Sequence, residues 1–137
     1  MLKKFFIIVI AFICVLSIGL FNRTSIFSEY SNTFEICFNR ASSSESIFSV
    51  KKGEFIFLDN VAGESFSTTA QDFNLDNFLN KFNARIVMVE KLENGVSYYA
   101  YSPTIKYKAQ ILDKTVNLQV FVGEKVTVGS PFIFGSF

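Results

Sequence analysis

Three residues of the chain alternate as they do at the start of a calcium-binding loop: Asp72, Asn74 and Asp76. Such a loop also needs a glycine at its sixth position and a bidentate glutamate at its twelfth. The chain has Asn77 and Asn83 at those positions. We therefore predict that these residues cap a helix and bind no metal.

Two other patterns imitate catalytic sites. Ser49 and Lys52 have the Ser-x-x-Lys spacing in which a lysine activates a serine nucleophile, but that serine must begin a helix, and here it lies in a predicted strand. Glu90 and Glu93 could act as an acid pair, but a hairpin places them on opposite faces. The chain has no histidine, which excludes histidine-dependent triads and Cys/His zinc sites. We predict no catalytic, cofactor-binding or metal-binding residue.

The two cysteines are not expected to pair, because Cys14 lies in an apolar run and Cys37 lies far along the chain. We predict that Cys37 is buried as a small apolar residue. A translocated domain without disulfides favours a bacterial envelope that does not depend on them.

The remaining candidate site is a surface of aromatic side chains that could contact a partner. Tyr99 and Tyr101 project together from a predicted hairpin, and three phenylalanines follow Ser130. This tail either completes the core as a terminal strand or forms part of an apolar contact surface. The second alternative includes Phe121, Val126 and Val128, which are expected on the face of the sheet opposite to that of Leu118 and Val120. The candidate partner surface comprises Tyr99, Tyr101, Phe121, Phe132 and Phe134.

The elements that position these residues begin with residues 5–21, a run of 17 without charge or proline that follows Lys3 and Lys4. As a helix it would be about 26 Å long, close to the hydrocarbon thickness of a bilayer. The lysines should stay in the cytoplasm, so the rest of the chain is expected outside it. The small residues that a signal peptidase requires, Ser17 and Gly19, lie inside the run, which favours retention over cleavage and leaves both open.

The rest of the chain is expected to form one domain, because compact domains usually have roughly 100–150 residues. Segments 24–33 and 39–46 are rich in Ser, Asn and Thr and are predicted as a stalk and a loop without core residues. The expected organisation is an anchor or signal segment over 1–23, a stalk over 24–33 and an exported α+β domain over 34–137. That domain is predicted to be a small antiparallel sheet of hairpins covered by one helix.

The Asn94-Gly95 pair predicts a hairpin with a type I′ turn, in a register that aligns Val89 with Ala100. Three further turns are predicted. Gly123-Glu124 joins 117–122 to 125–129 in a type II′ turn, Asp113-Lys114 aligns Ile111 with Val116 and Ala109 with Leu118, and Lys52-Gly53 joins 47–51 to 54–58.

One helix is predicted near residues 75–83, with an apolar stripe formed by Leu75, Phe78, Leu79 and Phe82. Asn74 is suited to cap it, and Phe73 can contact Phe78 across the first turn. The stripe should cover one face of the sheet.

Charge and composition narrow the function. The net charge of +1 and the lack of a basic stripe argue against nucleic-acid binding. We expect a single-pass membrane protein with its N-terminus in the cytoplasm, contacting lipid through residues 5–21 and a protein or envelope partner through its outer domain. That domain is expected to be a non-catalytic binding or scaffold module. The alternative is a secreted or anchored envelope hydrolase, which would need convergent titratable groups in a cleft.

Overall fold

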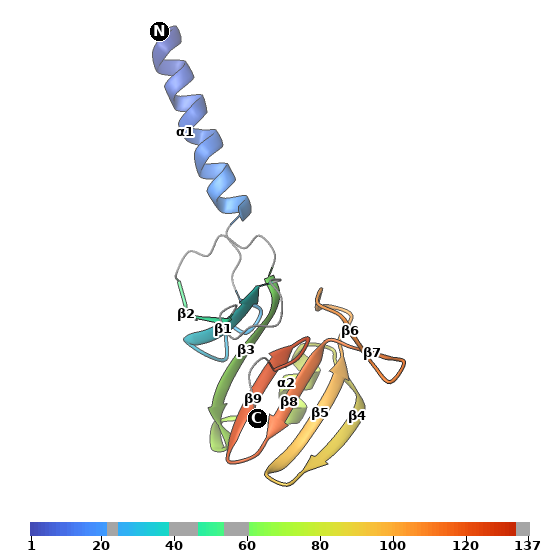
Figure 1. The fold of residues 1–137 in the computed structure, drawn as a ribbon. Helices are drawn as coiled ribbons and strands as arrows, with labels where there is room; N and C mark the ends of the chain where they lie inside the picture. The colour runs from blue at the N-terminus through green and yellow to red at the C-terminus, as the bar shows by residue number, and fades with distance from the viewer. Residues whose placement is uncertain (22–24, 39–46, 54–60, 134–137) are drawn as a thin grey trace.

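Alternating apolar residues build one large antiparallel sheet in this chain, which is α+β as predicted. The structure is a computed structural model that describes residues 1–21, 25–38, 47–53 and 61–133. Seven strands lie in the order β2-β1-β3-β9-β8-β5-β4, and β6 and β7 form a separate hairpin (Figure 1). The strands are β1 (Thr33–Phe38), β2 (Ile47–Lys51), β3 (Val61–Thr69), β4 (Arg85–Leu92), β5 (Gly95–Tyr101), β6 (Ala109–Ile111), β7 (Lys114–Val116), β8 (Leu118–Val122) and β9 (Lys125–Ser130).

The first helix, α1 (Leu2–Phe21), stands apart from the sheet (Figure 1). The side chains of residues 3–16 are exposed, and the four consecutive residues Phe5 to Ile8, which point in all directions around the helix, are each 66–68% exposed. Among the residues that the structure describes, no helix is both long enough and apolar enough to qualify as a membrane-crossing segment.

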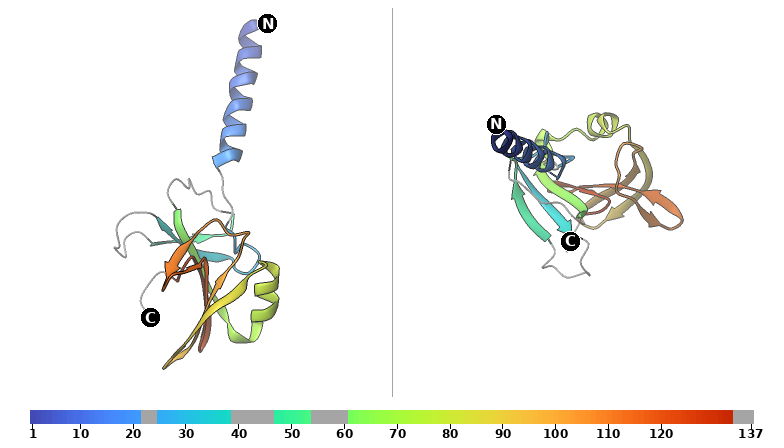
Figure 2. Two further views of the ribbon diagram at one scale, coloured as in Figure 1. Left: turned by 90° about the vertical axis from the view of Figure 1, so that its right-hand side faces the viewer. Right: turned by 90° about the horizontal axis from the view of Figure 1, so that it is seen from above.

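The second helix, α2 (Leu75–Lys81), covers one face of the sheet, as its apolar stripe predicts (Figure 2). Asn74 caps its N-terminus by accepting a hydrogen bond from the Asn77 amide at 2.9 Å. Phe78 and Leu79 are buried in the core, and the Phe73 and Phe78 rings lie 5.1 Å apart. The predicted cap, stripe and covering role are confirmed.

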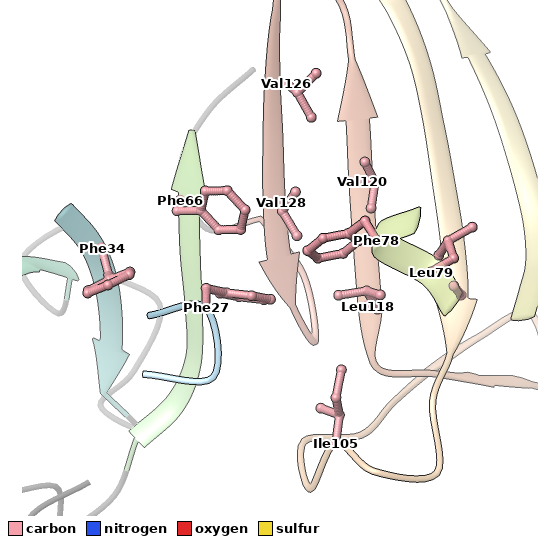
Figure 3. Close-up of a cluster of buried hydrophobic side chains, with 11 residues drawn as sticks. Phe27, Phe34, Phe66, Phe78, Leu79, Ile105, Leu118, Val120, Val126 and Val128 are labelled. Atoms are coloured by element: carbon pink, nitrogen blue, oxygen red, sulfur yellow. The ribbon is translucent and has the colours of Figure 1, made fainter. Parts of the chain in front are cut away.

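The core between α2 and the sheet also contains a residue from segment 24–33, which was predicted to be a stalk without core residues. Phe27 is 0% exposed, and its ring centroid lies 5.0 Å from that of Phe66 and 6.0 Å from that of Phe82 (Figure 3). Tyr30 packs against Phe78 with 4.9 Å between ring centroids. The expectation that residues 24–33 carry no core is therefore wrong, because two aromatic side chains among their polar neighbours are enough to dock the segment. The loop predicted over 39–46 lies outside the described residues.

The β4–β5 hairpin exists, but its predicted register is wrong by two residues. Val89 pairs with Tyr98 in place of Ala100, and the turn residues precede Gly95, which does not have a positive φ. Gly95 is required for close approach: a Cβ there would lie 2.4 Å from the Val122 carbonyl oxygen and 2.7 Å from the Phe121 ring. A shift of two leaves the same side chains on each face.

The β8–β9 hairpin also forms, with Val122 opposite Val126 and without the type II′ turn, since Gly123 has no positive φ. This register places Val126 and Val128 on the same face as Val120, in the core. The prediction that these two valines lie on the other face of the sheet from Val120, beside Phe121, is wrong. A difference of one residue in register reverses every side chain of a strand.

The β6–β7 hairpin turns at Leu112 and Asp113, whose φ values of 45° and 64° give a turn of the type I′ kind. The turn lies one residue earlier than predicted, so Ile111 pairs with Lys114 and Ala109 with Val116. Leu118 pairs with β5 at Ala100, so its predicted pairing with Ala109 is wrong.

Gly53 has a φ of 91°, in agreement with a turn after Lys52. Strand β2 pairs with β1, with Phe48 opposite Ile36. Its predicted partner over 54–58 lies outside the described residues.

Candidate functional site

A groove of about 630 Å³ lies between the β4–β5 pair and the β6–β7 hairpin. Its volume falls within the range of about 300–1,000 Å³ that is typical of ligand sites. Three cationic side chains are prominent in a lining that comprises Arg85, Val87, Tyr101, Lys108, Ala109, Gln110, Lys114 and Thr115.

Strand ends and a tight turn position the cations. Arg85 begins β4 and pairs with Tyr101 at the end of β5, directly after the core residue Ala100, so both lie on the face away from α2. Lys108 precedes β6, and Lys114 follows the turn and donates a long hydrogen bond of 3.4 Å to the Val87 carbonyl. The hairpin thereby brings two lysines beside the first residue of β4.

Among the described residues that line the groove, there is no carboxylate to oppose its positive charge. Asp113 is next to Lys114 in sequence, but it belongs to the exposed tip of the turn. In the described part of the chain, the ion pair is formed by Lys81 and Glu29. Both side chains are exposed at the surface, and neither lines the groove. Three like charges around one space raise its positive potential and favour an anion there.

The other lining groups suit an organic anion. Arginine can bind a phosphate or carboxylate through two parallel hydrogen bonds, whereas lysine acts as a mobile point charge. Gln110 donates to the Thr115 hydroxyl at 2.9 Å, and these side chains form a polar wall. Tyr101 supplies a flat aromatic surface. The arrangement is suited to holding a ligand with more than one negative group.

Of the residues predicted to form a partner surface, Tyr101 lines the groove and Tyr99 lies two residues before it on the same strand face. The Tyr99 hydroxyl donates to Glu90 at 2.9 Å. Burial raises the pKa of Tyr99, and the hydrogen bond to Glu90 raises it further against an opposing effect of Ser97. Tyr99 is thus held as a hydrogen-bond donor within the protein.

Two of the other predicted surface residues, Phe121 and Phe132, are not among the described residues that line the groove. A Cβ added at Gly95 or at Gly123 would lie less than 3 Å from the Phe121 ring, so this ring covers both glycines. Phe132 is half-buried where the tail turns back over β9: a Cβ at Gly129 would lie 2.2 Å from the Phe132 carbonyl oxygen. Phe134 lies outside the described residues.

The tail does not continue the sheet over residues 131–133, because β9 ends at Ser130. The Ser130–Pro131 peptide is cis, and the Ile133 amide donates to the Gln119 side chain at 3.0 Å. Gln119 is buried and in turn donates to Ser97 at 2.9 Å. For these residues, a terminal strand is the wrong prediction.

Glu64 is a buried carboxylate on β3 that the sequence analysis did not identify. It accepts hydrogen bonds from the Ser25 hydroxyl, from the Ile26 amide at 3.0 Å and from the Tyr107 hydroxyl at 2.9 Å. These bonds fasten the segment after α1 and the segment before β6 to the sheet. A lone glutamate in a strand has no spacing signal that could have revealed this role.

The structure also places two residues of the chemical patterns considered in the sequence. Ser49 is exposed in strand β2, and Cys37 is buried as predicted. Within the described ranges, no three His, Cys, Asp or Glu side chains gather as metal ligands would.

The groove cations themselves were not identified from the sequence. Lys108 is the first of the two lysines, and Arg85 lies 23 positions before it. Clusters of basic residues in sequence are a recognisable signal, but these cations are brought together only by the placement of the β6–β7 hairpin.

Comparisons with known proteins give no relative for this arrangement. No family model matches the chain, and no curated protein or solved structure is significantly similar to it.

Proposed function

We propose that the protein is a membrane-anchored extracytoplasmic binding module that takes an anionic ligand in the groove between β4–β5 and β6–β7. The observation that carries the proposal is the convergence of Arg85, Lys108 and Lys114 on one space, with no carboxylate among the described residues that line it. Binding fits this groove better than hydrolysis, because a hydrolase needs an acid and a base placed to move a proton.

Two features support the anchor. Residues 5–21 carry no charge and follow two lysines, which favours an inward N-terminus. The consecutive side chains Phe5 to Ile8 are exposed all around α1. A helix that is apolar on every side is normally buried in a protein or in a membrane. The domain then functions outside the cytoplasm, at the envelope.

Ligand binding is tested with the full chain in zwitterionic detergent, using tripolyphosphate as the probe and calorimetry as the measurement. The test variant carries Arg85→Gln, Lys108→Gln and Lys114→Gln. The control variant carries Lys52→Gln, Lys91→Gln and Lys125→Gln, which removes the same charge from exposed lysines outside the groove lining.

The groove variant should bind about tenfold more weakly than the wild type. Exposed ion pairs contribute about 0.2–1 kcal/mol each, and a factor of ten corresponds to about 1.4 kcal/mol. The control variant should keep most of its affinity, and added salt should weaken wild-type binding. Equal losses in both variants, or no wild-type binding at low salt, would contradict the proposal.

A further inference from the structure

The tether between α1 and the folded domain is very short. Only residues 22–24 separate Phe21, the last residue of α1, from Ser25. Ser25 and Ile26 are already fixed to Glu64 by hydrogen bonds, and Phe27 is in the core. The chain from Phe21 to Ser25 spans at most about 14 Å when fully extended.

This length limits where the domain can lie. If α1 spans the bilayer, the docked segment at residues 25–31 must remain at the level of the lipid headgroups or just outside them. A flexible stalk over 24–33 would have let the domain move away, but docking of Phe27 and Tyr30 removes that freedom. The domain is therefore held against its own membrane.

The groove lies toward that membrane. In two views turned by 90° about the vertical axis, the β6–β7 hairpin, drawn in orange, is in the half of the domain nearer α1 (Figures 1 and 2). Its lysines Lys108 and Lys114 and the adjacent Arg85 line the groove. Basic side chains near an anionic lipid surface are each attracted to it, with a range limited to about a Debye length.

We infer that the ligand of the groove is the headgroup of an anionic phospholipid in the bilayer that holds α1. This inference rests on the proposed function, and it names the ligand of the same site. The headgroup phosphate would be bound by Arg85 and the two lysines. Tyr101, beside Arg85, would lie at the interface, where tyrosine is favoured because it is apolar at one end and polar at the other.

The test uses the full chain in lipid nanodiscs of two compositions, phosphatidylcholine alone and phosphatidylcholine with about 30% phosphatidylglycerol. Amide hydrogen exchange of residues 106–116 is measured in each by mass spectrometry. Exchange should be roughly fivefold slower in the anionic discs for the wild type and for the control variant with Lys52→Gln, Lys91→Gln and Lys125→Gln. The variant with Arg85→Gln, Lys108→Gln and Lys114→Gln should show no difference between the discs.

Three results would overturn the inference, and they separate it from the proposed function. Equal wild-type exchange in both discs, with tripolyphosphate binding intact in detergent, would mean that the groove takes a soluble anion. Slowing that persists in the groove variant would place the lipid contact elsewhere. If the chain did not co-elute with discs of phosphatidylcholine, α1 would not be a membrane anchor. That result would contradict both the inference and the membrane part of the proposed function.

Discussion

Replacing Phe27 with alanine is expected to destabilise the domain strongly, although the segment that carries it is mostly polar. The ring is completely buried and contacts the Phe66, Phe78 and Phe82 rings at centroid distances of 5.0, 6.3 and 6.0 Å. Truncation of a buried phenylalanine costs about 3–5 kcal/mol through lost transfer energy and the cavity left behind. For a domain of this size, each kcal/mol lowers the melting temperature by about 4 °C, so we expect a fall of about 12–20 °C.

Tyrosine fluorescence during thermal unfolding measures this change in the full chain. All five tyrosines lie after residue 29, so the signal reports on the sheet domain and excludes α1. The matched control is Phe48→Ala, because the Phe48 side chain is 54% exposed at the edge strand β2 and should cost much less. A melting temperature for Phe27→Ala equal to that of the control would show that residues 25–31 are not part of the core.

Two further substitutions and one truncation test other parts of the fold. Gly95→Ala should lower the free energy of unfolding in denaturant by about 1–3 kcal/mol, because its Cβ would lie 2.4 Å from the Val122 carbonyl oxygen; a value equal to that of the wild type would contradict the close approach of Val122 and Phe121 to this glycine. Asn117→Ala should lower the free energy of unfolding in urea by about 2–3 kcal/mol. The buried Asn117 side chain accepts from the Ser102 amide at 2.8 Å and donates to the Ser102 carbonyl at 2.7 Å, and both backbone groups would lose this partner. A loss below about 0.5 kcal/mol would refute this. A chain that ends at Pro131 should have a lower melting temperature than the full chain, because it loses the Ile133–Gln119 hydrogen bond and uncovers Gly129. An unchanged melting temperature, with loss of association with a partner, would instead identify the tail as a partner site.

Helix α2 could be predicted from the sequence because its determinants are local. Asn74 caps the helix through a residue three positions away, and the buried residues repeat at the spacing of a helix turn. The hairpins were predictable as hairpins for the same reason. The register of the β4–β5 hairpin was not, because its glycine lies in the strand and not in the turn. Gly95 was interpreted as a turn residue, whereas the Phe121 ring and the neighbouring strand require it for close approach.

Long-range features could not be derived from local patterns. Phe27 stands among polar residues, and its burial depends on Phe66 and Phe78, which are distant in sequence. The pairing of β3 with β9 joins segments about 60 residues apart and had no local signal. The groove belongs to this class, because Arg85 and Lys108 meet only after the β6–β7 hairpin is placed beside β4.

The most direct test of the central claim is to locate the bound anion. Amide resonances of the isotope-labelled full chain in zwitterionic micelles would be followed during a titration with tripolyphosphate. The account predicts saturable shifts concentrated at the groove, in residues 85–87, 101, 108–110 and 114–115. Shifts concentrated instead around Tyr99, Phe121 and Phe132, or none up to millimolar tripolyphosphate at low salt, would contradict it.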